Sequence, residues 1–159
     1  MTDGRTYPAA PVLAVSAAII RNGKVLIVRR ARPPAAGLYT LPGGGVEVGE
    51  TLVEAVAREI REETALVVEP VGLAGYREAI GRDDDGRIER HFVILPFAAR
   101  WIAGEPVLSE ELSEAMWLDP AALAGLKTTA GLAEIVANAM ALVARAEVYL
   151  SPLAGRGSG

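Results

Sequence analysis

The chain has 159 residues, of which 51% are hydrophobic and 23% charged, as expected of one globular domain and not of a disordered chain. Its formal net charge of −4 argues against a nucleic-acid polymer as partner, because proteins that bind such polymers usually carry a basic surface. The absence of cysteine excludes disulfides, zinc–thiolate sites and thiol nucleophiles.

The N-terminal part of the chain predicts a β-hairpin followed by a loop. The nearly continuous apolar run at residues 12–20 is typical of a strand that is buried on both faces. Asn22-Gly23 is the signal of a two-residue hairpin turn, so residues 25–28 are expected to form the returning strand. Residues 29–45 are rich in Pro, Gly and Arg and are expected to form a loop.

The middle of the chain predicts a helix and a second pair of strands. Helical spacing of apolar residues extends over residues 51–64. Residues 66–79 and 88–97 are expected to form an antiparallel pair joined by a turn at residues 83–86. Pro96 predicts an edge or a bulge, because proline cannot donate a hydrogen bond to a neighbouring strand.

The C-terminal part predicts a short strand and a long helix. Residues 115–118 form the strand candidate, and Asp119-Pro120 is a typical helix start, with an N-cap followed by proline. Apolar residues at helical spacing predict a terminal helix from Leu132 to Val143 and beyond. The most apolar stretch, residues 132–150, is interrupted by charged side chains. Its longest charge-free run is much shorter than the ~20 apolar residues needed to span a bilayer. We therefore expect a cytoplasmic α/β protein that makes no membrane contact.

Helix 51–64 is expected to carry an acidic cluster. At helical periodicity Glu59, Glu62 and Glu63 share one sector of the helix surface. The neighbouring sector is expected to face the sheet and holds Val53, Val56, Ala57 and Ile60. The residues expected to point toward water are Glu54, Arg58 and Arg61. The acidic cluster would then lie at the border between core and solvent.

Three carboxylates within one helical turn favour a bound cation, because like charges at this spacing repel one another. Carboxylate oxygens suit Mg²⁺ or Mn²⁺ better than soft metals. The alternative is a solvated acidic face that is neutralised by nearby arginines.

A glycine-rich segment precedes this helix at residues 41–45, with the sequence Leu-Pro-Gly-Gly-Gly. Consecutive glycines let the backbone approach a ligand closely, so one carbonyl could complete a metal shell. The alternative is a simple tight turn.

Together these residues resemble the Nudix box, whose pattern is G-x5-E-x7-R-E-U-x-E-E-x-G-U with U an aliphatic residue. The residues that match at the required spacing are Gly44, Glu50, Arg58, Glu59, Ile60, Glu62, Glu63 and Leu66. Ala65 departs from the pattern, since the family has glycine just past the helix end, where a left-handed residue is favoured. Alanine there would cost about 1 kcal/mol if that conformation is kept, or else the helix end would shift.

The resemblance implies a Nudix α/β/α sandwich, with a mixed β-sheet between helices, at residues 12–150. Residues 1–11 would form a flexible N-terminus and residues 151–159 a disordered tail. The implied reaction is hydrolysis of the diphosphate bond of a nucleoside diphosphate linked to another group, by attack of a metal-activated water on phosphorus. Family members frequently form homodimers.

The implied site residues follow from the same match. Glu59, Glu62 and Glu63 would bind Mg²⁺, with Mn²⁺ as an alternative and the Gly43 carbonyl as a further ligand. Arg58 and Glu50 would orient these carboxylates through ion pairs.

An additional catalytic base is expected before Trp117, because Nudix enzymes often place a glutamate shortly before an aromatic residue there. Glu114 is the first choice, with Glu110 and Glu111 in reserve, and an acidic surface loop is the alternative. Trp117 itself is expected to lie in the core.

Substrate contacts are expected from the residues that enter the glycine segment. Arg29, Arg30 and Arg32 follow a strand, and Arg29 and Arg30 should point to opposite faces of the sheet, so that at most one of them lines the cleft. We assign Arg30 and Gly44 to the substrate site.

The sequence leaves the nature of the small-molecule nucleotide open. A nucleoside triphosphate, including an oxidised one, and an ADP-ribose-like sugar nucleotide both fit. A protein of a different class, a catalytically silent Nudix domain that only binds a ligand, would be expected to have lost a metal carboxylate, whereas all three are present here. A plain acidic surface would neither bind Mg²⁺ nor be stabilised by it.

Overall fold

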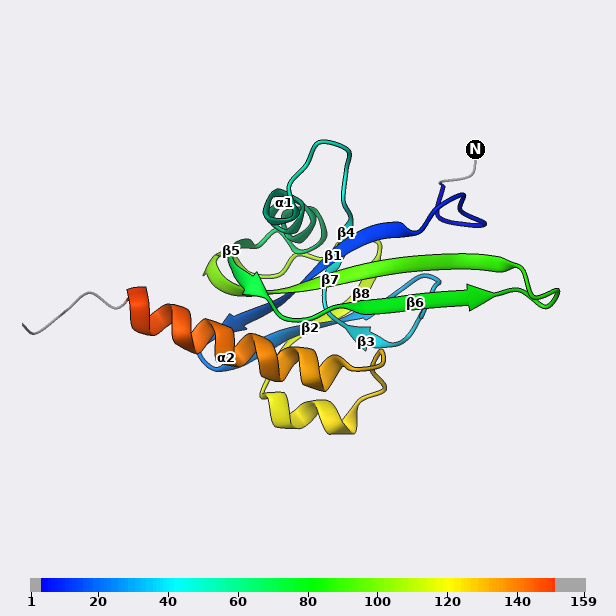
Figure 1. The fold of residues 1–159 in the computed structure, drawn as a ribbon. Helices are drawn as coiled ribbons and strands as arrows, with labels where there is room; N and C mark the ends of the chain where they lie inside the picture. Colours follow the sequence, from blue (N-terminus) through cyan, green and yellow to red (C-terminus); the bar gives the residue numbers. More distant parts are fainter. Residues whose placement is uncertain (1–3, 151–159) are drawn as a thin grey trace, which may run out of the picture.

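The computed structural model describes residues 4–150 and shows an eight-stranded mixed sheet with helices on both faces (Figure 1). The strands are β1 (Val12–Arg21), β2 (Lys24–Arg30), β3 (Tyr39–Thr40), β4 (Gly43–Gly45), β5 (Val67–Leu73), β6 (Arg77–Arg82), β7 (Ile88–Ala103) and β8 (Leu112–Leu118). The helices are α1 (Leu52–Thr64), the 3-10 helix η1 (Pro120–Gly125) and α2 (Leu132–Leu150). The α/β/α arrangement around a mixed sheet that the sequence predicts is therefore confirmed.

Strand β1 organises the sheet. On one side it pairs with β7 in parallel, from Val12 to Ile20. On the other side it pairs antiparallel with β4 near its start and with β2 near its end, and β2 continues to β3 and β8. The predicted hairpin between β1 and β2 is confirmed: Asn22 and Gly23 both have positive φ, as the two-residue turn requires.

Residues 66–79 form two strands where the sequence predicted one. They are separated at Gly75, whose φ of +146° lies in a region that residues with a side chain rarely adopt. β6 pairs with the first part of β7 and β5 with the second part. Pro96 lies in β7 at the change of partner, where its carbonyl accepts a hydrogen bond from the Ala74 N–H (2.8 Å). Its missing N–H faces the same gap, so the predicted edge or bulge is a break between two partner strands.

The loop predicted over residues 29–45 contains the two short strands β3 and β4. The remaining elements follow the predictions closely: α1 begins after Thr51, and η1 begins after the N-cap Asp119. Among the described residues no helix has the length and hydropathy needed to cross a membrane.

Two hydrophobic cores lie on opposite faces of the sheet. One joins α1 to the sheet, and the other joins α2 to the opposite face (Figure 1). The residues of α1 that are buried are Ala55, Val56, Ile60 and Thr64. Val53 and Ala57, which the helical pattern assigned to the core, are exposed, and Val53 retains 51% of its accessible surface. The buried face of α1 is thus rotated toward Glu59 and Glu63.

The N-terminal segment is tethered to the hairpin that β6 forms with β7. The Tyr7 N–H donates to the Glu89 carbonyl (2.8 Å), and its hydroxyl donates to the Asp83 carboxylate (2.8 Å). These contacts attach residue 7 to the hairpin, within the N-terminal segment that was predicted to be flexible. Residues 1–3 and the tail predicted to be disordered, residues 151–159, lie outside the described residues.

Candidate active site

Helix α1 is defined at both ends by local hydrogen bonds. At its start the Thr51 side chain accepts from the Glu54 N–H (3.1 Å), as an N-cap residue should. At its end Ala65 adopts the left-handed conformation (φ 61°, ψ 8°), and its N–H donates to the Arg61 carbonyl (2.9 Å). Ala65 therefore adopts the left-handed conformation expected of the motif glycine, and the helix end is not shifted.

We predict that Ala65→Gly raises the free energy of unfolding by about 1 kcal/mol, because glycine adopts the left-handed conformation without the steric cost that alanine carries. Urea unfolding followed by circular dichroism measures the change. Ala57→Gly is the matched control: it lies at an exposed position inside the same helix and should lower stability by about 1 kcal/mol. Equal destabilisation by both changes would contradict the left-handed assignment.

The three glycines form strand β4, where the sequence left a tight turn as the alternative. Gly43, Gly44 and Gly45 pair with β1 residues 14–16, and this pairing holds them beneath α1. A Cβ atom on Gly43 would lie 2.1 Å from the Val15 carbonyl oxygen, and one on Gly44 would lie 2.4 Å from the Glu59 carboxylate carbon. The missing side chains thus let α1 approach the sheet with its glutamates inward, which explains the rotation of the helix.

We predict that Gly43→Ala lowers the free energy of unfolding by about 2 kcal/mol, since the added methyl group would overlap the backbone of Val15 and Ser16 in β1, which the sheet holds in place. Thermal and urea unfolding would show the loss. Gly81→Ala in β6 is the control, because a Cβ there would meet nothing nearer than 3.8 Å. The close approach of β4 to β1 at Gly43 would be refuted if the two substitutions had equal effects.

Arg58 folds back over the acidic cluster, although the helical pattern had pointed it toward water. Its Nε and Nη2 atoms donate to both carboxylate oxygens of Glu50 (2.6 and 2.8 Å), and Nη2 also donates to the Gly45 carbonyl (2.9 Å). Its Nη1 atom donates to Glu59 (2.8 Å) and Glu62 (3.2 Å). The structure thus contains the ion pairs between Arg58 and the carboxylates that the family resemblance implied. Glu54 and Arg61 are exposed, as predicted.

The electrostatics of this cluster follow from these contacts. The hydrogen bonds from Arg58, together with the Glu47 N–H, lower the pKa of Glu50 to about 2. The pKa of Glu63 is raised to about 7, chiefly by burial of its carboxylate. Within that net shift, the negative charges of Glu59 and Glu111 also raise the pKa, whereas the Gly43 N–H, which donates to Glu63 (3.0 Å), and the Arg30 guanidinium lower it. Glu63 therefore lies in a crowded, poorly solvated acidic environment.

The three helix glutamates differ in exposure. The Glu59 side chain keeps 13% of its accessible surface and that of Glu62 keeps 59%, and Glu63 is half-buried, so the cluster lies at the border between core and solvent, as predicted. Within residues 4–150 no three acidic or histidine side chains are grouped closely enough to hold a metal ion as they are placed. The donor types nevertheless fit a hard cation, because carboxylates of α1 face backbone groups of β4.

Arg29 and Arg30 lie on opposite faces of the sheet, as predicted. Arg30 is on the α1 side, where its charge acts on Glu63, and its Nε donates to the Pro34 carbonyl (2.6 Å). Arg29 is on the α2 side, where its Nε donates to the Gly37 carbonyl (3.0 Å). Arg32 is more than half exposed and pairs with Glu110 and Glu111.

Glu114 is not brought together with the helix glutamates. In β8, Ala115 and Trp117 pack in the core on the α1 side, so the alternation of a strand turns Glu114 to the α2 side. There it accepts a hydrogen bond from the Tyr39 hydroxyl (2.5 Å) and lies 3.9 Å from Arg29. Glu111, one of the reserve residues, precedes β8 and lies near enough to affect Glu63. Trp117 packs in the core, as expected.

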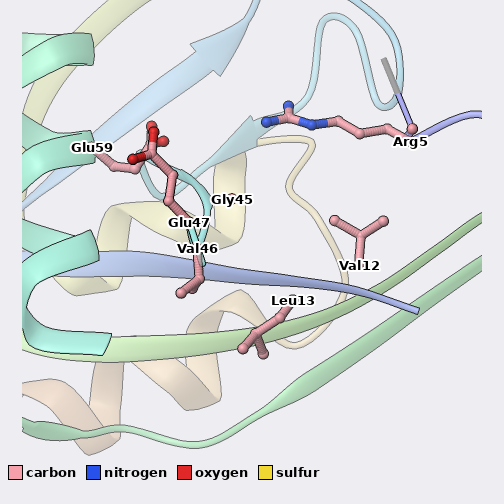
Figure 2. Close-up of a pocket in the computed structure, with 8 residues that line it drawn as sticks. Arg5, Val12, Leu13, Gly45, Val46, Glu47 and Glu59 are labelled. Carbon is pink, nitrogen blue, oxygen red and sulfur yellow. The ribbon is translucent and has the colours of Figure 1, made fainter. Parts of the chain in front are cut away.

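A pocket of about 240 Å³ opens beside Glu59 (Figure 2). The residues that line it are Gly4, Arg5, Val12, Leu13, Gly45, Val46, Glu47 and Glu59. A second hollow, on the exposed side of the cluster, is lined by Ala57, Arg58, Arg61 and Glu62. The sequence assigned no role to Arg5, because a single arginine ahead of the first strand carries no spacing signal and reaches the site only through the tertiary fold.

Comparisons with known proteins place these features in context. A family model described as the NUDIX domain matches residues 10–139. The chain is 38% identical over 109 residues to an ADP-ribose pyrophosphatase of Methanocaldococcus jannaschii. The aligned region is 69% of this chain and 62% of that protein. It is 33% identical over 116 residues to a MutT-like protein of Streptomyces ambofaciens, covering 72% of this chain and 68% of that protein.

Solved structures agree with these matches. A MutT Nudix hydrolase from Burkholderia pseudomallei superposes with a TM-score of 0.65 at 29% identity and covers 84% of this chain and 98% of its own. The MutT protein from Methanosarcina mazei superposes with a TM-score of 0.66 at 27% identity, covering 82% of this chain and 94% of its own.

Proposed function

The chain belongs to the Nudix family, and on that premise we propose that it hydrolyses the diphosphate bond of a small nucleotide with the help of a divalent cation. The observation that carries the proposal is the packing of Glu59 and Glu63 of α1 against the glycine strand β4, with Arg58 and Glu50 locked together beside them. All the carboxylates of the family motif are present and lie on this one helix and the turn before it.

Arg58 acts as a positioning residue. Its two-pronged ion pair with Glu50 fixes the plane of the guanidinium, and the Glu47 N–H in turn holds Glu50 (3.0 Å). The remaining guanidinium nitrogen then presents Glu59 and Glu62 at a defined orientation. Such a fixed support lets carboxylates keep their places when a charged substrate enters.

The cation would be held by Glu59, Glu62 and Glu63 and by the Gly43 carbonyl, with Mg²⁺ preferred and Mn²⁺ as the alternative. The Glu59 and Glu63 carboxylates lie one helical turn apart and repel each other, and a divalent cation between them would relieve that repulsion. When bound, it would neutralise charge on the diphosphate and lower the pKa of a water molecule.

Glu111 is the proposed general base. It lies on the α1 side of the sheet, near Glu63, whereas Glu114 lies on the other side and is held by Tyr39. A carboxylate next to the helix glutamates can accept the proton of the attacking water, which a carboxylate behind the sheet cannot.

The proposed substrate is a nucleoside diphosphate linked to another group, with ADP-ribose first and nucleoside triphosphates second. The relative named ADP-ribose pyrophosphatase supports placing ADP-ribose first. Cytoplasmic location, the lack of a nucleic-acid partner and the homodimer remain predictions.

A screen of ADP-ribose, sugar nucleotides, dinucleoside polyphosphates and nucleoside triphosphates tests the proposal, with and without Mg²⁺ and with products identified by mass spectrometry. We expect a nucleoside monophosphate and a phosphorylated remainder, formed only when the metal is present. Tight binding of these compounds without any product would instead support the silent binding domain.

A further inference from the structure

The N-terminal segment places a positively charged side chain, Arg5, in the pocket beside Glu59. Arg5 lies two residues before Tyr7, which is tied to the β6–β7 hairpin by its backbone N–H and by its hydroxyl. The Arg87 guanidinium also lies over the Tyr7 ring, 4.6 Å from its centre. These contacts place the segment at the mouth of the pocket, and Figure 2 shows the Arg5 side chain extending toward Gly45.

Gly45 makes room for this side chain. A Cβ atom at that position would lie 3.2 Å from Nη2 of Arg5, closer than side chains normally approach. The guanidinium therefore lies over the backbone of the glycine strand, in the same pocket as Glu59 and Glu47. Figure 2 shows Glu59 entering that pocket from α1, on the side opposite Arg5.

The charges of the pocket indicate what Arg5 can bind. Among the described residues that line it, Arg5 is the only basic one, and the other charged groups are the Glu47 and Glu59 carboxylates. A diphosphate that approaches these carboxylates needs a basic group, and a guanidinium suits phosphate oxygens in both charge and shape.

We propose that Arg5 binds a phosphate of the substrate's diphosphate, so that the N-terminal segment forms part of the substrate site. This inference rests on the proposed hydrolase function. It assigns Arg5 to substrate binding, whereas the carboxylates of α1 hold the cation.

The test is calorimetric titration, in the presence of Mg²⁺, of an ADP-ribose analogue in which a methylene group replaces the bridging oxygen of the diphosphate. Arg5→Ala should weaken binding about 10- to 100-fold, the usual loss for a charged hydrogen-bonding partner. Arg5→Lys should recover part of this affinity, since it keeps the charge and loses the planar fork. Arg82→Ala is the control, because Arg82 is exposed on the hairpin and bonds only to the Gly86 carbonyl among the contacts described.

Binding by Arg5→Ala within about twofold of wild type would overturn the inference while leaving the hydrolase intact. The hydrolase has its own readout, which is product formation by the wild-type protein from ADP-ribose itself. A wild-type protein that neither binds the analogue nor cleaves any diphosphate nucleotide would overturn both.

Discussion

Replacing Glu63 by glutamine should lower kcat by at least about 10³-fold, because the buried carboxylate would no longer contribute negative charge to the cation site. The side chain accepts a hydrogen bond from the Gly43 N–H and lies near the other acidic residues of the cluster. Steady-state hydrolysis of ADP-ribose at saturating Mg²⁺ measures the effect.

Glutamine is a suitable substitution because its amide oxygen can still accept the Gly43 N–H, so that the fold should be retained. Glu54→Gln is the matched control, since Glu54 is exposed on the opposite side of the same helix. Near wild-type turnover by the Glu63 variant would remove this residue from the mechanism.

Glu111 and Glu114 should respond very differently to the same change. Glu111→Gln is expected to lower kcat about 10²-fold, the lower end of what a general base contributes. Glu114→Gln should change kcat less than about threefold, because Glu114 lies behind the sheet and bonds to Tyr39. The comparison needs only the two variants and one substrate, with kcat measured at saturating substrate.

The opposite outcome is informative as well. If Glu114→Gln were the inactive variant, β8 would have to present this residue to the α1 side when substrate is bound, and the placement of the base would be wrong. If neither variant lost activity, the proton would have to be accepted by a carboxylate of the helix itself.

The elements that sequence patterns predicted well are those governed by local signals. Asn22-Gly23 closes a hairpin because both residues tolerate positive φ, and Thr51 starts a helix because its side chain caps an N–H group. The spacing of the motif glutamates likewise placed Glu59 and Glu63 on the same side of α1. The acidic cluster could therefore be located before any tertiary contact was considered.

What the sequence could not show depends on neighbours distant along the chain. Val53 and Ala57 fit the apolar pattern of α1, yet both are exposed. Because β4 has no side chains, the side of the helix that carries Glu59 packs against the sheet instead. Arg58 has a solvent-facing position by periodicity, but Glu50 and the Gly45 carbonyl pull it back over the cluster.

The placement of Glu114 failed for a related reason. A spacing of three residues puts Glu114 and Trp117 on opposite faces of β8, but which of the two cores Trp117 joins is decided by the tertiary fold. Arg5 was not detected at all, since its approach to Glu59 depends on the tethering of Tyr7 to a distant hairpin.

Calorimetric titration of Mg²⁺ into the protein without substrate tests the cation site of α1 on its own. We predict saturable binding to the wild-type protein, loss of that binding in Glu63→Gln and in Glu59→Gln, and unchanged binding in Glu54→Gln. Equal Mg²⁺ binding by all four proteins, or none by the wild type, would contradict the assignment of these glutamates as metal ligands.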